Sequence, residues 1–300
     1  MSRLLSTNPS IAVNSIRETK VMNLRAILVG ALGTVLLCTF RAGQESTERK
    51  VTIRCAVIGG MTDTGLWPAI AKRFEDRTGH TIEVVATGNK RAIATVFEEG
   101  NIDLLTMHAS DTIINLVADG FGEDPQPWAR NDLLIVGPPD DPAGIRGETD
   151  AVKALNKIVS SKSKLLTHAS LGTNEVLANL LSVGEIELDP AHVISLPSDK
   201  HRQMLERASK EHAYTLVGRI PFLNAKIARH DMQIMVQGDS RLRRPYLVIV
   251  ATRKEPDTRH AAARQLAAFL RSAETQEWLK EFGKGAYDDQ PLFFPVKINK

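Results

Sequence analysis

Four short segments rich in Gly, Ser and Thr each follow a strand-like run and precede a helix-like run. They are Ile58 to Thr64, Thr87 to Asn89, Met107 to Asp111 and His168 to Thr173. In an open α/β sheet such loops lie at the carboxyl ends of the strands, where ligands bind. Amides at helix starts, together with hydroxyls, can hold an anion without a cationic side chain. We therefore expect a cleft for a small anionic ligand.

The candidate ligand-binding residues are the small, hydroxyl-bearing and histidine residues of these loops. Thr64, Ser110 and Thr173 are also good N-caps for their own helices, so one such loop alone indicates only capping. Four loops, with two glycines that allow close backbone approach, favour a ligand cleft. The candidates are Gly59, Gly60, Met61, Thr62, Thr64, Thr87, Gly88, His108, Ser110, His168, Ser170, Gly172 and Thr173.

The common catalytic signatures are missing from the sequence. It has no phosphate-binding G-x-x-x-x-G-K-[ST], no H-E-x-x-H, no G-x-S-x-G and no cysteine pair for zinc. His201 and His212 are eleven residues apart on either side of a predicted helix and are more typical of solvated residues than of metal ligands. We expect no metal, no cofactor and no enzymatic activity, and an enzyme built on scattered residues is the third alternative.

Composition is that of a soluble globular protein with room for about two domains. The chain has 300 residues, 43% hydrophobic and 24% charged. Its formal charge of +3 comes from the first 44 residues, because residues 45–300 carry 33 Lys and Arg against 34 Asp and Glu. No basic surface for nucleic acid is expected.

The N-terminal segment, residues 1–44, is predicted to be an extension and a signal peptide. Its apolar run, Ala26 to Phe40, has fifteen residues, whereas spanning a bilayer takes about 20. A basic start followed by such a run is typical of secretion, with Met22 as an alternative start. An uncleaved anchor is the alternative, and both place the body in the periplasm or on the outer face of the cytoplasmic membrane.

A lipid anchor at Cys38 is not expected, because the residue before it, Leu37, is large. Cleavage near residues 42–44 would leave Cys55 as the single cysteine, so the fold cannot depend on an internal disulfide. Cys55 lies in an apolar run and is predicted to be a buried strand residue.

Short β-branched runs alternate with helical patterns from Val51 onward, which predicts an α/β fold with mainly parallel sheets. Gly79, Gly100, Gly120 and Gly184 fall where helices should end. The predicted strands are Val51 to Ile58, Thr81 to Ala86, Ile102 to Thr106, Asp132 to Val136, Lys164 to Thr167, Val193 to Leu196, Ala213 to Val217, Gln233 to Val236 and Tyr246 to Ala251.

The alternation breaks at the turn-rich stretch Gly137 to Pro142, which favours two lobes. A second crossing between the lobes is expected near Gly238 to Pro245. Two helices, about Asp257 to Ser272 and Ala273 to Phe282, then close the chain.

Several stretches resemble the periplasmic substrate-binding proteins of tungstate ABC importers, within the class that carries molybdate, sulfate and phosphate. The likeness runs from about Val51 to Phe294. The stretches that carry it are Ile135 to Gly147, Asp150 to Leu155, Ala213 to Leu216 with Arg219, Ala273 to Gly283, and Gln290 to Phe293.

The resemblance implies a type II periplasmic-binding-protein fold, in which two α/β lobes joined by two crossing strands close on a ligand. Lobe one would comprise residues 51–134 and 247–300, and lobe two residues 135–246. It implies a monomeric receptor that delivers a small anion, tungstate, molybdate or a larger one, to an ABC permease. Tyr214 and Arg219 would close on the ligand. The alternative is the same fold acting as a sensory or partner-binding module without transport.

The binding loops depart from the family pattern. Where the family has Thr-Thr-Thr-Ser, this chain has Val57-Ile58-Gly59-Gly60, so all four hydroxyls are absent. The family arginine of the second-lobe loop is replaced by His168, which is mostly neutral at pH 7. Arg219 then remains as the candidate charge, with a structural ion pair as its alternative role. We expect weaker binding of a bare tetrahedral oxyanion than of a larger anion.

Overall fold

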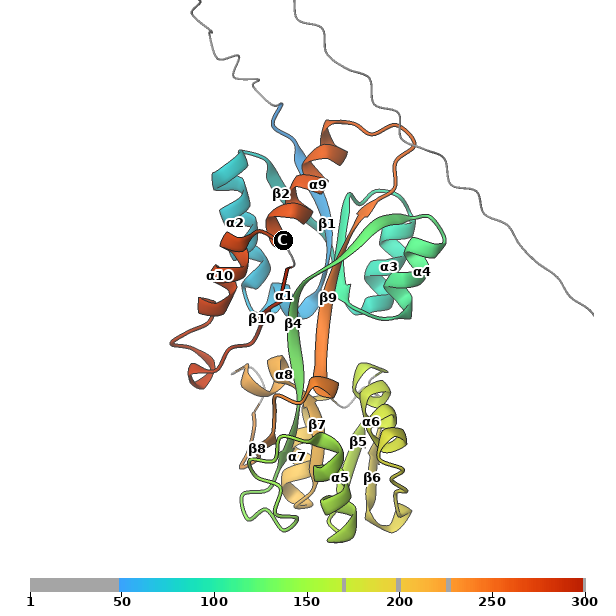
Figure 1. Ribbon diagram of the computed structural model, residues 1–300, viewed down its shortest axis with the longest axis vertical. Helices are drawn as coiled ribbons and strands as arrows, with labels where there is room; N and C mark the ends of the chain where they lie inside the picture. Colours follow the sequence, from blue (N-terminus) through green and yellow to red (C-terminus); the bar gives the residue numbers. More distant parts are fainter. Residues whose placement is uncertain (1–48, 169–170, 198–200, 225–227, 299–300) are drawn as a thin grey trace, which may run out of the picture. The chain divides into compact units, whose positions relative to one another are not determined.

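The computed structural model describes residues 49–168, 171–197, 201–224 and 228–298. The segment 48–300 is one compact unit. The predicted signal peptide, Cys38 and Ser170 lie outside the described residues. Figure 1 shows the arrangement of the elements.

The strands are short except for β4 and β9. They are β1 Thr52–Ile58, β2 Thr81–Gly88, β3 Leu104–His108, β4 Gly122–Gly137, β5 Leu165–His168, β6 Val193–Leu196, β7 Tyr214–Gly218, β8 Gln233–Val236, β9 Arg243–Ala251 and β10 Phe294–Pro295.

The helices connect and cover these strands. They are α1 Gly59–Asp63, α2 Leu66–Thr78, α3 Lys90–Glu98, α4 Asp111–Ala118, α5 Ala151–Ser160, α6 Leu171–Val183, α7 His201–Lys210, α8 Arg219–Leu223, α9 Thr258–Leu270 and α10 Ala273–Glu281, with short 3-10 turns η1 Pro190–His192, η3 Ser240–Leu242 and η4 Tyr287–Asp289.

Two parallel groups of strands flank an antiparallel centre. The strand order is β2-β1-β3-β9-β4-β7-β5-β6, and β8 and β10 each pair with β4. Strand β1 is parallel to β2 and β3, and β5 is parallel to β6 and β7. Short crossover helices impose this arrangement, since consecutive parallel strands need a crossover connection. The α/β fold class with two lobes and two crossing strands is confirmed.

Strand β4 belongs to both groups. Residues 122–132 pair with β9, and residues 133–137 pair with β7 and β8. The chain returns through η3 into β9, which lies beside β4 (Figure 1). These are the two crossing strands, and β4 changes its pairing partner from β9 to β7 between Asp132 and Leu133.

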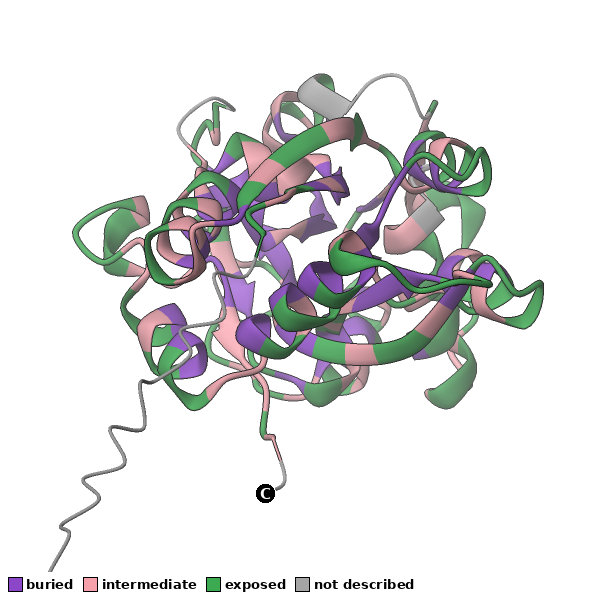
Figure 2. Cartoon of the chain, turned by 90° about the horizontal axis from the view of Figure 1, so that it is seen from above, coloured by how far each residue is buried: buried purple, intermediate pink, exposed green. Residues whose placement is uncertain are grey.

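Local sequence explains how the helices begin and end. Asn89 and Asp150 cap α3 and α5 by accepting backbone N–H groups, which satisfies donors that the helix leaves unpaired. Gly79 ends α2 in the left-handed region at φ 72°, a conformation that costs glycine little. Figure 2 shows buried residues along the inner strands and the inward faces of the helices. The larger core cluster runs from the β1–β3 region through to α7, β7 and α8, and a smaller one packs under α5 and α6.

The predicted strands are all present. Two of them, Val193–Leu196 and Gln233–Val236, have the predicted bounds, and the ends of the others differ by up to three residues. Strand β4 is the exception, because it begins ten residues before the predicted start at Asp132. Pro125 and Pro127 argue against a strand in the sequence. The structure accommodates them at register shifts between Glu123 and Gln126 and between Pro127 and Ala129.

Cys55 is buried in β1, as predicted. Among the described residues, no helix has both the length and the apolar character needed to cross a membrane.

Candidate functional site

The first two predicted loops meet at the carboxyl ends of β1 and β2. The register places Ile58 opposite Gly88, so Gly59 follows beside it. The Thr62 and Thr87 hydroxyl oxygens lie 3.0 Å apart. A Cβ placed on Gly59 would lie 3.5 Å from the Gly88 carbonyl oxygen. This is an ordinary van der Waals distance, so the two loops are adjacent without requiring a glycine at position 59.

The hydroxyls of the first loop are already engaged by its own backbone. Thr62 donates to the Gly59 carbonyl at 2.8 Å, and Thr64 donates to the Gly60 carbonyl at 2.8 Å. Met61 is fully buried in the core. This loop can therefore offer a ligand backbone N–H groups more readily than side-chain donors.

The third loop brings His108 and Ser110 to the same edge of the sheet. The His108 ring stacks on Tyr246 of β9 with centroids 4.1 Å apart, and its Nε2 lies 3.3 Å from Oδ1 of Asn131 on β4. Ser110 donates to the His108 carbonyl at 3.3 Å and does not cap α4 through its side chain. Burial, followed by the neighbouring Arg244, holds the pKa of His108 well below 6.5. His108 is therefore neutral at pH 7 and adds no positive charge.

The second lobe contributes the end of β5 and the start of α6. His168 ends β5 and is buried, with Gly172 and Thr173 in the first turn of α6. A Cβ placed on Gly172 would lie 2.5 Å from Nη2 of Arg244. The guanidinium of a crossing-strand arginine therefore lies against the first turn of α6.

Arg244 lies on the same face of the crossing strands as Asn131 and Tyr246, the two residues that contact the His108 ring. The register pairs Asn131 with Arg244 and Ala129 with Tyr246, and residues two apart along a strand point to the same face. Arg244 makes no hydrogen bond or ion pair with another described residue. Burial lowers the pKa of the Arg244 guanidinium, whereas the nearby Tyr246 and Glu175 act to raise it.

Lys90, at the first position of α3, is a second cation in this cluster. Burial lowers the pKa of its ammonium, Glu175 acts to raise it, and Arg244 lowers it further. The sequence did not single out Lys90 or Arg244. The sequence does contain a signal for Arg244, the pair Arg243-Arg244 at the predicted second crossing. Because successive side chains of a strand point to opposite faces, one of these two arginines must lie on the face that carries the site.

Arg219 and Tyr214, assigned to the ligand through the family resemblance, direct their side chains to other partners, although Arg219 begins α8, whose Ile220 lies against Gly60. Arg219 is 3% exposed, and its guanidinium donates to Gln237 at 2.8 Å and Gln290 at 3.3 Å and lies over the Phe294 ring. Its side chain joins lobe two to the C-terminal segment.

Tyr214 is the first residue of β7 and therefore lies at the opposite end of that strand from the loops. Its hydroxyl donates to Asp141 at 2.7 Å and accepts from the Ala143 N–H at 2.9 Å. Burial and the Asp141 carboxylate raise its pKa. These contacts give Tyr214 a structural role within lobe two.

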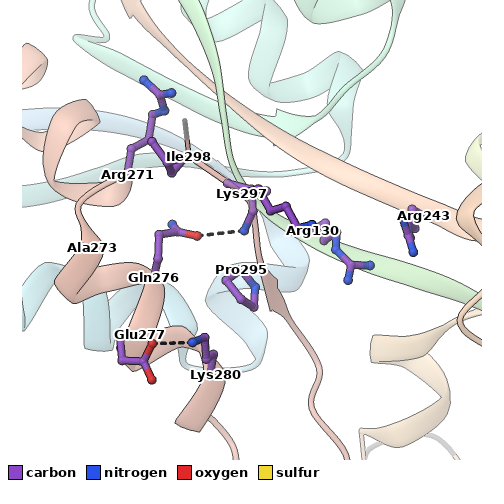
Figure 3. Close-up of a pocket in the computed structure, with 11 residues that line it drawn as sticks. Arg130, Arg243, Arg271, Ala273, Gln276, Glu277, Lys280, Pro295, Lys297 and Ile298 are labelled. Atoms are coloured by element: carbon purple, nitrogen blue, oxygen red, sulfur yellow. Dashed lines mark hydrogen bonds and ion pairs between the residues drawn. The ribbon is translucent and has the colours of Figure 1, made fainter. Parts of the chain in front are cut away.

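A separate groove of about 820 Å³ lies on the other face of the crossing strands, beside α10 (Figure 3). Its cations include Arg130, whose guanidinium lies 3.2 Å from Asp132, and Lys280, which pairs with Glu277. The lining residues are Arg130, Arg243, Arg271, Ala273, Gln276, Glu277, Lys280, Pro295, Val296, Lys297 and Ile298. None of the predicted ligand-binding residues lines it.

Metal binding has no support in the described part of the chain, where no group of three His, Cys, Asp or Glu side chains could hold an ion. Together, the loop amides, Lys90 and Arg244 can donate hydrogen bonds to a small anion and compensate its negative charge.

The fold and this cluster define a two-lobed solute-binding protein. Residues 53–284 match the family described as bacterial extracellular solute-binding protein, and the chain belongs to that family.

Relatives with more specific names are also similar. A protein of Haloferax volcanii, provisionally assigned as an ABC transporter anion-binding protein, is 31% identical over 86% of this chain and 75% of its own. The tungstate-binding protein TupA of Peptoclostridium acidaminophilum is 29% identical over 84% of this chain and 88% of its own.

Among solved structures, the tungstate-binding protein TupA of Desulfovibrio alaskensis G20 aligns with a TM-score of 0.70 and 25% identity. The alignment covers 82% of this chain and 99% of that one. The expected resemblance to the tungstate-type binding proteins is confirmed.

Proposed function

We propose that this protein is an exported receptor that binds a small oxyanion between its two lobes and delivers it to an ABC permease. The proposal is supported by the family membership and by relatives named for anion and tungstate binding. The observation that carries it is the Arg244 guanidinium, which faces the first turn of α6 without a hydrogen-bonding partner among the described residues.

A partly buried guanidinium without a partner is costly, because its charge has lost part of its water without compensation. An anion bound between α6 and the loops after β1, β2 and β3 would remove that cost. The amides of Gly59, Gly60 and Gly172 would add hydrogen bonds to the ligand oxygens, as amides at helix starts commonly do.

The two lobes would close on the ligand by bending the crossing strands. We assign lobe one to residues 51–134 and 247–300 and lobe two to residues 135–246. The contact that would seal the cleft joins Gly60 to α8, since a Cβ on Gly60 would lie 3.4 Å from Cδ1 of Ile220.

The remaining assignments follow from this role. The basic start and the apolar run Ala26 to Phe40 support export by a signal peptide without a lipid anchor at Cys38. The receptor would act as a monomer, without catalysis, in the periplasm or at the outer face of the cytoplasmic membrane.

Thermal unfolding of the purified protein tests the proposal. Sulfate, molybdate, tungstate and oxalate are added one at a time. A ligand present at about 100 times its Kd adds about 2.7 kcal/mol to the free energy of unfolding. At least one of these anions should raise the Tm in the wild type and should raise it much less in Arg244→Gln. If none of them changes the wild-type Tm, the proposal is overturned.

A further inference from the structure

The cluster around Arg244 differs from its surroundings in how its charges are balanced. Most other arginines and lysines of the described chain have a carboxylate within ion-pair distance, such as Arg253 with Asp103 at 3.1 Å. Arg244 and Lys90 have none among the described residues. Glu175, the carboxylate that acts to raise the pKa of both cations, is exposed and makes no ion pair with either of them.

A third polar group in this cluster also lacks a partner. Tyr246 is fully buried, and its hydroxyl has no partner in full hydrogen-bonding geometry, although the Asn131 side chain lies close enough to lower the pKa of the phenol. The residue lies two positions after Arg244 on the same face of β9. Buried hydroxyls are nearly always hydrogen-bonded, so this one points to a group that the chain itself does not supply.

Three hydroxyls of the loops after β1 and β3 are turned inward. Thr62 and Thr64 donate to backbone carbonyls of their own loop, and Ser110 donates to the His108 carbonyl. These three hydroxyls are therefore not donors that enforce the geometry of a ligand. Two cations and one phenol supply the directed interactions instead, and an ammonium group on a flexible chain tolerates different ligand shapes.

We propose that Arg244 and Lys90 make ligand charge, rather than ligand shape, the property that this receptor selects. It binds doubly charged anions of different shapes in preference to singly charged ones. The inference rests on the proposed function. The physical reason is that a dianion compensates both cations, whereas a monoanion leaves one of them desolvated and unpaired.

Isothermal titration calorimetry with three probes separates charge from shape. Tungstate and perrhenate are tetrahedral oxyanions of similar size, but tungstate carries two negative charges and perrhenate carries one. Oxalate is a planar dianion. We expect tungstate and oxalate to bind the wild type within about tenfold of each other, and perrhenate to bind at least about 100-fold more weakly than tungstate.

Variants assign the effect to the two cations. Arg244→Gln and Lys90→Gln should each reduce the ratio of tungstate to perrhenate affinity at least about tenfold, and Arg244→Lys, which keeps the charge, should retain most of it. Arg243→Gln is the matched control, because Arg243 is the neighbouring residue on the opposite face of β9 and should leave the ratio within about twofold. Circular dichroism of each variant verifies that it is folded.

The outcomes distinguish this inference from the function on which it rests. If tungstate binds the wild type but perrhenate binds equally well, or if Arg244→Gln keeps the wild-type ratio, selection by charge is overturned and the anion receptor stands. If tungstate binds at least about 100-fold more tightly than oxalate, shape decides, and the inference is equally overturned. If no probe and no other anion binds the wild type, the proposed function itself fails.

Discussion

Each face of the crossing strands β4 and β9 carries arginine side chains, but Arg244 on one face and Arg130 on the other differ in whether they have a partner. On one face, Asn131, Arg244 and Tyr246 surround His108. The Arg244 guanidinium makes no hydrogen bond to a described residue, and the buried phenol has only the Asn131 side chain beside it. On the other face, Arg130 pairs with Asp132 and lies over the Phe294 ring. Arg243 and Arg271 beside that second face make no ion pair with a described residue either, so the contrast is between Arg130 and Arg244.

This difference teaches which arginines to assign to function. A satisfied buried arginine stabilises the fold, and removing it leaves its partners unpaired. An unsatisfied one destabilises the fold until something binds to it. Arg219 donates through Nη1 and Nη2 to Gln290 and Gln237, although its Nε has no partner, whereas Arg244 makes no hydrogen bond to a described residue. The sequence alone does not distinguish the two arginines.

The largest expected effect is on stability, in Arg219→Ala. Loss of the hydrogen bonds to Gln237 and Gln290, and of the packing on Phe294, should reduce the free energy of unfolding by about 2 to 4 kcal/mol. Urea unfolding measures it, and the ratio of tungstate to perrhenate affinity should not change. A variant that loses affinity but not stability would return Arg219 to the ligand site.

The two fully buried tyrosines extend the comparison. Tyr214→Phe should lower the free energy of unfolding by about 1 to 2 kcal/mol, because the Asp141 carboxylate and the Ala143 N–H lose their partner. Tyr246→Phe removes a hydroxyl without a described partner and should leave the stability of the ligand-free protein within about 0.5 kcal/mol of the wild type.

Ligand binding should depend on the Tyr246 hydroxyl and not on the Tyr214 hydroxyl. Tyr246→Phe should weaken anion binding about fivefold to tenfold, and Tyr214→Phe should not change it. Calorimetry with tungstate decides between them. Equal behaviour of the two variants in both measurements would remove the distinction between satisfied and unsatisfied groups.

A smaller effect is expected from Gly172→Ala. Its new Cβ would approach Nη2 of Arg244 to 2.5 Å, so the flexible guanidinium would have to move away from α6. We expect anion binding to weaken about tenfold, or about 1.4 kcal/mol, with little change in stability. Asn174→Ala, an exposed position on the same helix, serves as the control. Unchanged binding in Gly172→Ala would show that the ligand does not use this position of Arg244.

The smallest effect concerns pH. Burial and the cations Arg244 and Lys90 hold the pKa of His108 well below 6.5, whereas the unfolded chain titrates near 6.5. Below that pH the unfolded state binds more protons than the folded state, so stability is lost as the pH falls. From pH 6.5 to 5.5 this residue should remove about 1 kcal/mol.

Chemical unfolding of wild type and His108→Gln at the two pH values measures this contribution, and the variant should lose about 1 kcal/mol less than the wild type. The same pH dependence in both proteins would contradict it. Saturating tungstate should reduce the loss, because an anion near Arg244 offsets the charge that opposes protonation.

Much of this protein is determined by its sequence alone. Alternating β-branched and amphipathic runs predict the strands and helices of both lobes, since these periods decide which face of each element is buried. The loops rich in Gly, Ser and Thr predict the edge at which the ligand site should lie, because parallel strands end together. Glycines after the helices predict their ends.

What only the tertiary structure decided is the direction of each side chain at that edge. Thr62 and Thr64 look like ligand donors but donate to their own backbone. Arg219 begins a short helix that turns its guanidinium toward the C-terminal segment, more than seventy residues away in sequence. Arg244 reaches the site because β4 and β9 pair in one register, and a shift by one residue would place Arg243 there instead. Periodicity along the chain carries no information about pairing between distant strands, so the charge of the site could not be read before the strands were placed.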